Sequence, residues 1–390
     1  MTDLVTRPIT IPTAALLTSR GRGAVATVRL VGDFGLVDAP APPLFRAANG
    51  RPVAQQSVDQ TVFGQWGANA DVSEDVVLCR SDKNIIEVHC HGGEAATAAI
   101  LSDLESRGCE IVTWQHQAEQ LGGRFEAECL EALSHATTTQ TADLILEQHA
   151  GVLRREIEGI HNLANDGGPD PNQLIVERLD ALLRWADFGL HLSKPWQVVL
   201  AGRPNVGKSS LINALVGFSR SIVYDQPGTT RDVVTAETAI EGWPVQFSDT
   251  AGLRDGGDAV EMAGIERTRE TLAEADCCIL LFDTSRAPHV DDRQLLTEWP
   301  DAIHVAHKCD LPNVWDSAEL ESALPVSSVT GVGLEELAGR IIARLIPIVP
   351  TTGTPVPICQ RQVVLLTRAR EEIVAGRLAG ATASLGECLR

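Results

Sequence analysis

The stretch "GRPNVGKSS", residues 202–210, decides the fold of the central part of this chain. Gly202, Gly207, Lys208 and Ser209 satisfy the spacing G-x-x-x-x-G-K-S within it. An apolar strand pattern precedes the stretch and "SLINAL" follows it with helical spacing, which is the context that a phosphate-binding loop requires. Glycines there let backbone N–H groups converge on phosphates, the lysine offers a positive charge, and the serine hydroxyl can join Mg²⁺. The stretch therefore predicts a site for a nucleoside triphosphate.

Strand and helix patterns alternate around this loop. The runs "WQVVLAG" and "CCILLFDTS" are typical of buried strands, whereas "KSSLINALVG" and "GLEELAGRIIARLI" carry apolar residues at helical spacing. This alternation predicts an α/β domain over residues 194–348, with a parallel sheet covered by helices on both faces.

Two further motifs supply the other parts of a phosphoryl-transfer site. "PGTTRD" contributes Thr229 and Thr230, and "DTAG" places Asp249 at a strand end, followed by Gly252. Phosphoryl transfer needs a hydroxyl on Mg²⁺, a metal-associated carboxylate and a glycine N–H that senses the γ-phosphate. We therefore expect Ser209 and Thr230 to be the Mg²⁺ ligands.

The segment "VAHKCDLP", residues 305–312, stands where a guanine-specificity box is expected. Asp310 can accept hydrogen bonds from the N1–H and N2 amino groups of guanine, which adenine does not offer. His307 stands where an Asn is usual, and a neutral imidazole can replace one hydrogen bond of the amide but not its whole pattern. The alternative interpretation is a loop histidine that weakens nucleotide binding. Asp310 favours GTP and GDP in either case.

A last loop, "PVSSVTGVG", offers backbone donors near Ser327 and Ser328 to the guanine O6 atom. The residues predicted to contact GTP are thus Asn205, Val206, Gly207, Lys208, Ser209, Ser210, Thr229, Thr230, Asp249, Gly252, His307, Lys308, Asp310, Ser327 and Ser328.

Helical patterns flank the α/β segment, at 126–163 and 173–192 before it and at 360–380 after it. We expect these segments to pack together as an α-helical domain into which the P-loop domain is inserted, preceded by a small α+β domain. The predicted boundaries are 1–115 for the N-terminal domain, 116–193 for the first helical part, 194–348 for the α/β domain, and 349–390 for the linker and second helical part.

Composition limits the partners and the compartment. The 390 residues carry a formal net charge of -20, which repels phosphate backbones at long range, so any RNA contact is expected to be local or supplied by a partner. The nine cysteines form no CxxC pair, and no secretory or membrane-spanning pattern is seen. These features predict a reduced, cytoplasmic chain that does not bind membranes.

Four segments resemble the G domain of the MnmE (TrmE) family of tRNA-modification GTPases. They are "GRPNVGKSSLINAL", "SIVYDQPGTTRD", "DTAGLRD" and "VEMAGIERT". The N-terminal segments "SRGRGAVATVRLVG" and "IIEVHCHGG" also resemble that family. The resemblance implies a Ras-like G domain and a homodimeric GTPase that works with the flavoprotein MnmG on C5 of the tRNA wobble uridine.

The resemblance also implies a mechanism. The family holds an activating K⁺ with the P-loop Asn, here Asn205, and with switch-I carbonyls, here in the segment "YDQPGTT". It uses a switch-II Glu acting through water, here Glu261 as the catalytic residue. A K⁺ near the β- and γ-phosphates can do the electrostatic work of an arginine finger. Apart from the resemblance, Glu261 is more simply interpreted as an exposed carboxylate at a helix start.

The N-terminal motifs "GRG" and "HGG" belong in the family to a region that binds a tetrahydrofolate derivative and mediates dimerisation. The corresponding candidates are Arg22, His91 and Gly92, and tight β-turns are the alternative interpretation. A second alternative is a metal site, because Glu87, His89 and His91 alternate along one predicted strand.

Two departures from the family keep a second function open. The chain reads "WQHQAEQLGGRFEAECLEAL" where the family has a "PGEFTxRAFxNG" type of loop, and it ends in "ASLGECLR" where members end in C-x-G-K. Cys388 is therefore not assigned the role of the family's terminal cysteine. The alternative function is a divergent GTPase that acts as a regulatory or ribosome-assembly switch without modifying tRNA.

Overall fold

The structure is a computed structural model, and it describes residues 11–390 apart from residues 20, 22, 40, 68–72, 167–170, 219–234, 250–273 and 317. The chain forms two compact units, one up to Glu131 together with Arg390, and the other from Ala132 to Leu389. Among the described residues, each unit contains one sheet.

The first unit is built on a sheet of seven described strands in the order β3-β4-β5-β6-β2-β1-β7. Neighbouring strands are antiparallel except β1 and β7, which run parallel. Buried and exposed residues alternate along strands such as β4, because one face of the sheet carries the core. The elements are β1 (Thr13–Leu16), β2 (Val25–Val31), α1 (Gly35–Asp38), β3 (Phe45–Ala47), the 3₁₀ helix η1 (Val53–Gln55), β4 (Thr61–Trp66), β5 (Glu74–Asp82), β6 (Ile85–His91), α2 (Glu94–Ser106) and β7 (Glu110–Ile111).

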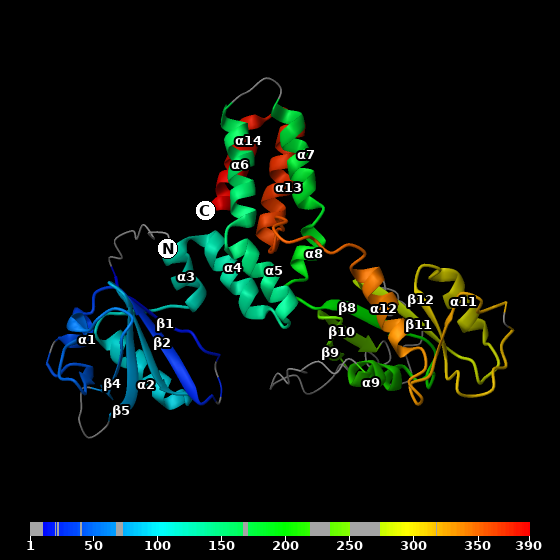
Figure 1. Ribbon diagram of the computed structural model, residues 1–390, viewed down its shortest axis with the longest axis horizontal. Helices are drawn as coiled ribbons and strands as arrows, with labels where there is room; N and C mark the ends of the chain where they lie inside the picture. The colour runs from blue at the N-terminus through cyan, green and yellow to red at the C-terminus, as the bar shows by residue number, and fades with distance from the viewer. Residues whose placement is uncertain are drawn as a thin grey trace, which may run out of the picture. The chain divides into compact units, whose positions relative to one another are not determined.

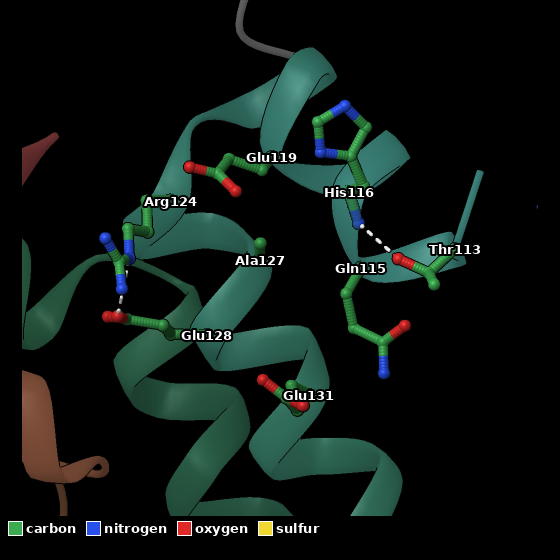
Figure 2. Close-up of a pocket in the computed structure, with 8 residues that line it drawn as sticks. All are labelled: Thr113, Gln115, His116, Glu119, Arg124, Ala127, Glu128 and Glu131. Carbon is green, nitrogen blue, oxygen red and sulfur yellow. Dashed lines mark hydrogen bonds and ion pairs between the residues drawn. The ribbon is translucent and has the colours of Figure 1, made fainter. Parts of the chain in front are cut away.

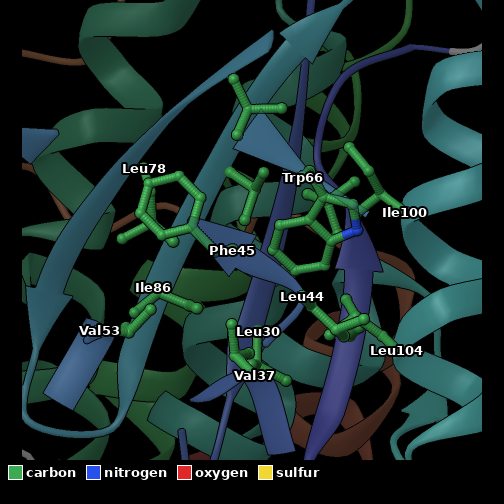
Figure 3. Close-up of a cluster of buried hydrophobic side chains, with 14 of the residues drawn as sticks. Leu30, Val37, Leu44, Phe45, Val53, Trp66, Leu78, Ile86, Ile100 and Leu104 are labelled. Carbon is green, nitrogen blue, oxygen red and sulfur yellow. The ribbon is translucent and has the colours of Figure 1, made fainter. Parts of the chain in front are cut away.

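Helix α2 covers the buried face of this sheet. Its Ile100 and Leu104 lie in one hydrophobic cluster with Leu30 of β2 and Trp66 of β4 (Figure 3). The indole Nε1 of Trp66 donates a hydrogen bond of 3.1 Å to Asp103 of the same helix, so the buried ring keeps its polar group satisfied. The unit therefore has the α+β composition expected at the N-terminus.

Helices make up the segments on either side of the α/β region. They are α3 (Trp114–Gly122), α4 (Arg124–His135), α5 (Thr139–His149), α6 (Val152–Asp166), α7 (Pro171–Leu183), α8 (Ala186–Leu190), α13 (Gln360–Val374) and α14 (Leu378–Leu389). Thr113 and Thr138 cap α3 and α5, because each side chain accepts a hydrogen bond from a backbone N–H in the first turn. In the second unit α13 packs against α7, and α14 packs against α6 (Figure 1). Helices that are far apart in sequence thus share one bundle.

The second unit also contains a sheet of six described strands in the order β13-β12-β11-β8-β10-β9. All neighbours are parallel except β9, which is antiparallel to β10. The elements are β8 (Trp196–Ala201), α9 (Lys208–Phe218), β9 (Thr235–Ile240), β10 (Trp243–Asp249), β11 (Cys277–Asp283), α11 (Val290–Glu298), β12 (Ile303–His307), β13 (Leu324–Val326) and α12 (Leu334–Leu345). The strands predicted from "WQVVLAG" and "CCILLFDTS" are confirmed as β8 and β11, and the two predicted helices are confirmed as α9 and α12.

Both faces of this sheet are covered. Leu280 and Phe282 of β11 pack in a cluster with residues of α11, and the alternate residues Ile279 and Leu281 of the strand are fully buried on the other face. Helices α9 and α12 contact each other, and α12 also contacts β11. In a parallel sheet covered on both sides, the carboxyl ends of the strands meet at one edge, and ligands bind there. This edge positions the candidate site.

In the described part of the chain, no helix combines the length and the apolar character that crossing a bilayer requires.

Candidate functional site

The phosphate loop, residues 202–207, connects β8 to α9 in a conformation that demands glycine. Gly202 has φ +147° and Gly207 has φ +106°, which side chains rarely adopt. A Cβ atom at Gly202 would lie 2.6 Å from the carbonyl oxygen of Leu281, and one at Gly207 would lie 2.5 Å from Cε1 of His307. The predicted motif glycines are thus required by backbone conformation and by space.

Lys208 begins α9 and turns its side chain back over the phosphate loop. Its Nζ atom donates a hydrogen bond of 3.1 Å to the carbonyl oxygen of Gly202 and lies 3.6 Å from Oδ1 of Asp249. The side chains of Lys208 and Asp249 are only 5% and 6% exposed, so this charge pair is held in a largely water-excluded position.

Ser209 and Asp249 come together from two different elements. Ser209 Oγ donates a hydrogen bond of 2.9 Å to Oδ2 of Asp249, the last residue of β10. The register of β10 with β8 pairs Asp249 with Leu200, so Asp249 ends its strand beside the start of the phosphate loop. A hydroxyl and a carboxylate oxygen are ligands that Mg²⁺ prefers, and the donor set therefore fits this ion.

His307, at the end of β12, is buried between the phosphate loop and the segment after β13. The residue is 1% exposed. Its Nδ1 lies 2.8 Å from the carbonyl oxygen of Val206, and its Nε2 lies 3.2 Å from Oγ of Ser328. The motif predicted that the imidazole replaces only one hydrogen bond of an amide, whereas the ring has a partner at each nitrogen.

Burial is the main influence on the pKa of His307 and lowers it. The hydrogen bond to Val206 opposes this effect, and the charge of Lys308 adds to it, so that the pKa lies below its ordinary value of 6.5. The imidazole is therefore neutral near pH 7. A carbonyl oxygen can only accept, so Nδ1 carries the proton, and Nε2 accepts the hydrogen bond that the Ser328 hydroxyl donates.

Lys308 links the neighbouring strand to the phosphate loop. Its Nζ donates hydrogen bonds of 2.6 Å to Oδ2 of Asp283, at the end of β11, and of 3.2 Å to the carbonyl oxygen of Asn205. Burial would raise the pKa of Asp283, but hydrogen bonds from Lys308 and Ser285 outweigh it and lower the pKa from its ordinary value of 3.8. Asp283 is not among the predicted site residues, although its place directly after the apolar run "CCILLF" was a signal for this edge of the sheet.

The segment after β13, residues 327–333, is called the guanine loop here. The buried Ser327 holds it together, because its Oγ accepts hydrogen bonds from the N–H groups of Val329 and Thr330. The N–H of Ser327 donates to the carbonyl oxygen of Val332 at 3.0 Å and is therefore already occupied. No described residue accepts a hydrogen bond from the N–H of Ser328. Ser328 is thus the better donor of the two predicted positions.

The remaining predicted residues divide into exposed and undescribed ones. Asn205, Ser209, Ser210 and Asp310 are exposed around the same edge of the sheet, and Asn205 has a positive φ of 64°. The predicted residues that lie outside the described part of the chain are Arg22, Thr229, Thr230, Gly252 and Glu261.

In the N-terminal unit, Gly92 and His91 follow each other at the end of β6. A Cβ atom at Gly92 would lie 2.2 Å from the carbonyl oxygen of Gly23, so the close approach that this glycine permits is to another backbone segment. The imidazole of His91 is hydrogen bonded to Glu74. Backbone hydrogen bonds join the two segments, because the N–H of Gly23 donates to the carbonyl oxygen of Gly92 at 3.2 Å and the N–H of Gly92 donates to that of Ala24 at 3.1 Å.

The other residues of the "EVHCH" strand have separate partners. Glu87 accepts a hydrogen bond of 2.7 Å from Arg29, and Nδ1 of His89 is 2.9 Å from Oγ1 of Thr27. Among the described residues, no group of three or more His, Cys, Asp or Glu side chains is arranged to hold a metal ion.

A hollow of about 450 Å³ lies between α3 and α4, in the segment that departs from the family pattern (Figure 2). Arg124 lies 3.6 Å from Glu128, while Glu119 and Glu131 add two further carboxylates. The lining carries a negative charge that disfavours anionic ligands. The lining residues are Thr113, Gln115, His116, Glu119, Arg124, Ala127, Glu128 and Glu131, and none of the candidate folate residues is among them.

Comparison with known proteins gives matches for the central part of the chain. Residues 197–308 match the family model described as 50S ribosome-binding GTPase. The G domain of the T. maritima FeoB iron transporter is similar to part of the chain, with 29% identity, 38% of this chain and 98% of that chain covered, and a TM-score of 0.30.

Two curated relatives extend over nearly the whole chain. The tRNA modification GTPase MnmE of Latilactobacillus sakei subsp. sakei (strain 23K) is 31% identical over 94% of this chain and 88% of its own length. The tRNA modification GTPase MnmE of Synechococcus sp. (strain RCC307) is 32% identical over 87% of this chain and 82% of its own length. Together with the P-loop α/β fold, these matches show that the chain is a GTP-binding, GTP-hydrolysing enzyme that belongs to the MnmE family of tRNA modification GTPases.

Proposed function

We propose that this GTPase takes part in modifying C5 of the tRNA wobble uridine together with an MnmG-like flavoprotein. The observation that carries the proposal is the meeting of Lys208, Ser209 and Asp249 beside the phosphate loop, within a chain whose relatives are named tRNA modification GTPases. An acidic chain is expected to reach tRNA mainly through its partner.

The phosphate end of the site is assigned to five residues. Gly207 lets the backbone of the loop approach the β- and γ-phosphates, and the Lys208 ammonium group faces their negative charge. Ser209 and Asp249 offer the hydroxyl and carboxylate that fit Mg²⁺, and Thr230 is the proposed second hydroxyl. Bound Mg²⁺ would neutralise charge that develops on the phosphates during transfer. The contact of 3.6 Å between the largely buried side chains of Lys208 and Asp249 would keep both groups oriented before the nucleotide binds.

The guanine end of the site is assigned to residues from two loops. Asp310 is exposed, and no described residue donates a hydrogen bond to its carboxylate, which leaves both oxygens for the N1–H and N2 amino groups of guanine. The free N–H of Ser328 is the proposed donor to O6. Lys308 braces this end against Asn205 of the phosphate loop. An adenine nucleotide would leave the Asp310 carboxylate without its donors and is therefore rejected.

K⁺ activation and the role of Glu261 are part of the proposal. Asn205 is exposed at the phosphate loop, and its amide oxygen is a suitable ligand for a hard monovalent cation. Its backbone carbonyl is held by Lys308 at 3.2 Å, which fixes the residue whose side chain would face K⁺. Glu261 is proposed to orient the attacking water.

The remaining assignments concern the N-terminal and helical regions. We assign a tetrahydrofolate derivative to the region of Arg22, His91 and Gly92, and a homodimer as the active form. The packing of α13 on α7 and of α14 on α6 supports a helical domain into which the P-loop domain is inserted.

GTP turnover of the full chain tests the mechanism. Hydrolysis should be faster in K⁺ than in Na⁺ at equal ionic strength, and equal rates would remove the K⁺ assignment. Glu261→Ala should lower turnover by roughly 100-fold while GTP affinity stays within about twofold. Glu336→Ala, which removes an exposed carboxylate of α12, is the matched control.

Mass spectrometry of tRNA tests the pathway. Deletion of the gene should remove the C5 modification of wobble uridines, and expression of the wild-type chain should restore it. Unchanged modification in the deletion strain would instead support the regulatory or ribosome-assembly switch.

A further inference from the structure

The buried imidazole of His307 contacts two loops that come from different parts of the sequence. One partner is the carbonyl oxygen of Val206 in the phosphate loop, at 2.8 Å, and the other is the hydroxyl of Ser328 in the guanine loop, at 3.2 Å. We propose that His307 and Ser328 act as one positioning pair, which holds the phosphate loop and the guanine loop at a fixed spacing and thereby determines how tightly guanine nucleotides are held. This inference deepens the proposed function and rests on it.

The direction of each hydrogen bond makes the two residues a matched pair. The carbonyl oxygen of Val206 has no proton to give, so the proton of the neutral ring is on Nδ1. Nε2 is then a bare acceptor in a residue that is 1% exposed, and it needs a donor. Ser328 supplies that donor through its hydroxyl. Removing the hydroxyl would leave a buried nitrogen unsatisfied, which is more costly than the loss of an exposed hydrogen bond.

The ring is also fixed by packing. The space that a Cβ atom would need at Gly207 is filled by His307, whose Cε1 and Nδ1 atoms would lie at 2.5 and 2.8 Å from it. The imidazole therefore cannot shift toward the phosphate loop without displacing that loop. A shift of the ring toward Gly207 would therefore move the backbone of the phosphate loop with it.

The guanine loop can transmit this constraint because it is internally ordered. Ser327 binds the N–H groups of Val329 and Thr330 through its side chain, and its carbonyl oxygen accepts a hydrogen bond of 2.9 Å from Gly331. Ser328 lies at the start of this ordered turn. The hydroxyl of Ser328 binds His307, and the N–H of Ser328 is the proposed donor to guanine O6. The hydrogen bond to His307 therefore fixes the position of this N–H.

Nucleotide binding by the full-length chain tests the pair. Ser328→Ala should weaken GDP binding by roughly 5- to 30-fold, mainly through faster dissociation of a fluorescent GDP, because it leaves His307 unsatisfied. Ser328→Thr keeps the hydroxyl and should restore most of the affinity. Thr330→Ala changes an exposed hydroxyl on the same loop and is the matched control.

Inosine diphosphate separates positioning from general damage. It carries O6 but lacks the N2 amino group, so Ser328→Ala should weaken GDP and IDP binding by the same factor. Asp310→Ala should instead reduce the preference for GDP over IDP. A change of less than twofold in Ser328→Ala, or an equal loss in Thr330→Ala, would overturn the proposal.

Two measurements without nucleotide keep the pair testable on its own. ¹⁵N NMR should report a resonance of the Nδ1–H tautomer that disappears in His307→Asn. The unfolding free energies of His307→Ala, Ser328→Ala and the double variant should be non-additive, with the double variant hardly worse than His307→Ala. Additive losses or an Nε2–H tautomer would refute the pair. Failure of the wild-type chain to bind guanine nucleotides, with both of these results intact, would refute only the nucleotide assignment.

Discussion

Ser209 and Asp249 are 40 positions apart in sequence, yet Ser209 Oγ donates a hydrogen bond of 2.9 Å to Oδ2 of Asp249. The contact exists because β8 and β10 are parallel neighbours, and the residues that follow or end these strands meet at one edge of the sheet. Lys208, adjacent to Ser209, lies 3.6 Å from the same carboxyl group.

Replacement of this carboxylate tests its part in hydrolysis. Asp249→Asn keeps the shape and an oxygen that can accept from Ser209, but it removes the negative charge near Lys208 and the proposed Mg²⁺ position. We expect GTP turnover at saturating Mg²⁺ to fall by roughly 100-fold. GTP affinity measured in EDTA should change little. Asp301→Asn, at an exposed position, should retain wild-type turnover, and wild-type turnover in Asp249→Asn would contradict the assignment.

A methyl group at Gly207 should damage the phosphate loop. The added Cβ would lie 2.5 Å from the buried ring of His307, and the backbone has φ +106°. We expect Gly207→Ala to lower the unfolding free energy by about 1–3 kcal/mol and to abolish GTP binding at micromolar concentrations. Gly339→Ala in α12, where nothing lies within 4 Å of the new atom, should raise stability by about 0.5–1 kcal/mol. Urea unfolding and fluorescent-nucleotide titration measure both effects, and equal behaviour of the two variants would refute the packing argument.

His307 should make the second unit less stable in mild acid. Burial is the largest influence on the pKa of His307 and lowers it, and the charge of Lys308 lowers it further. The hydrogen bond to Val206 and the charges of Asp283 and Asp310 raise it, but by less. The unfolded chain then binds a proton near the ordinary value of 6.5 while the folded chain does not. The contribution of neutral His307 to the unfolding free energy is fully present above pH 6.5. It is lost as the pH falls from 6.5 through the lower pKa of the folded state. Urea unfolding at a series of pH values should show this loss in the wild type and a weaker loss in His307→Asn.

His191 should stabilise the second unit more in mild acid than in mild base, which is the reverse of His307. Burial alone would lower the pKa of His191, but the hydrogen bond and charge of Asp276, 3.4 Å away, outweigh it and raise the pKa above 6.5. The His191–Asp276 pair contributes fully to the unfolding free energy below pH 6.5. This contribution is lost as the pH rises through the pKa of His191 in the folded state. His191→Asn should therefore cost most stability at the acid end of the range and least at pH 8 to 9. His161→Asn in α6 is the control, and a cost in His191→Asn that is independent of pH would contradict the ion pair.

Local sequence patterns predicted most of the helices and strands of the α/β domain at residues 194–348. The helix after "GRPNVGKSS" and the strand "CCILLFD" are confirmed because glycine spacing and apolar runs are properties of short segments. The seven-stranded order of the N-terminal sheet was not predictable in this way, since β2 pairs with β6 across a long stretch of chain. Asp283 was missed for the same reason: its partner Lys308 is 25 positions away, on the next strand.

The sequence by itself determined the chemistry of the phosphate loop, because a turn that needs positive φ at Gly202 and Gly207 admits few residues, and a lysine and serine then follow at the start of a helix. It also indicated guanine through Asp310. Only the tertiary structure decided what His307 does, since its ring has no partners until β11 pairs with β8 and β12, and β12 pairs with β13. That alignment brings Val206 and Ser328 to its two nitrogens, and burial there makes both hydrogen bonds necessary.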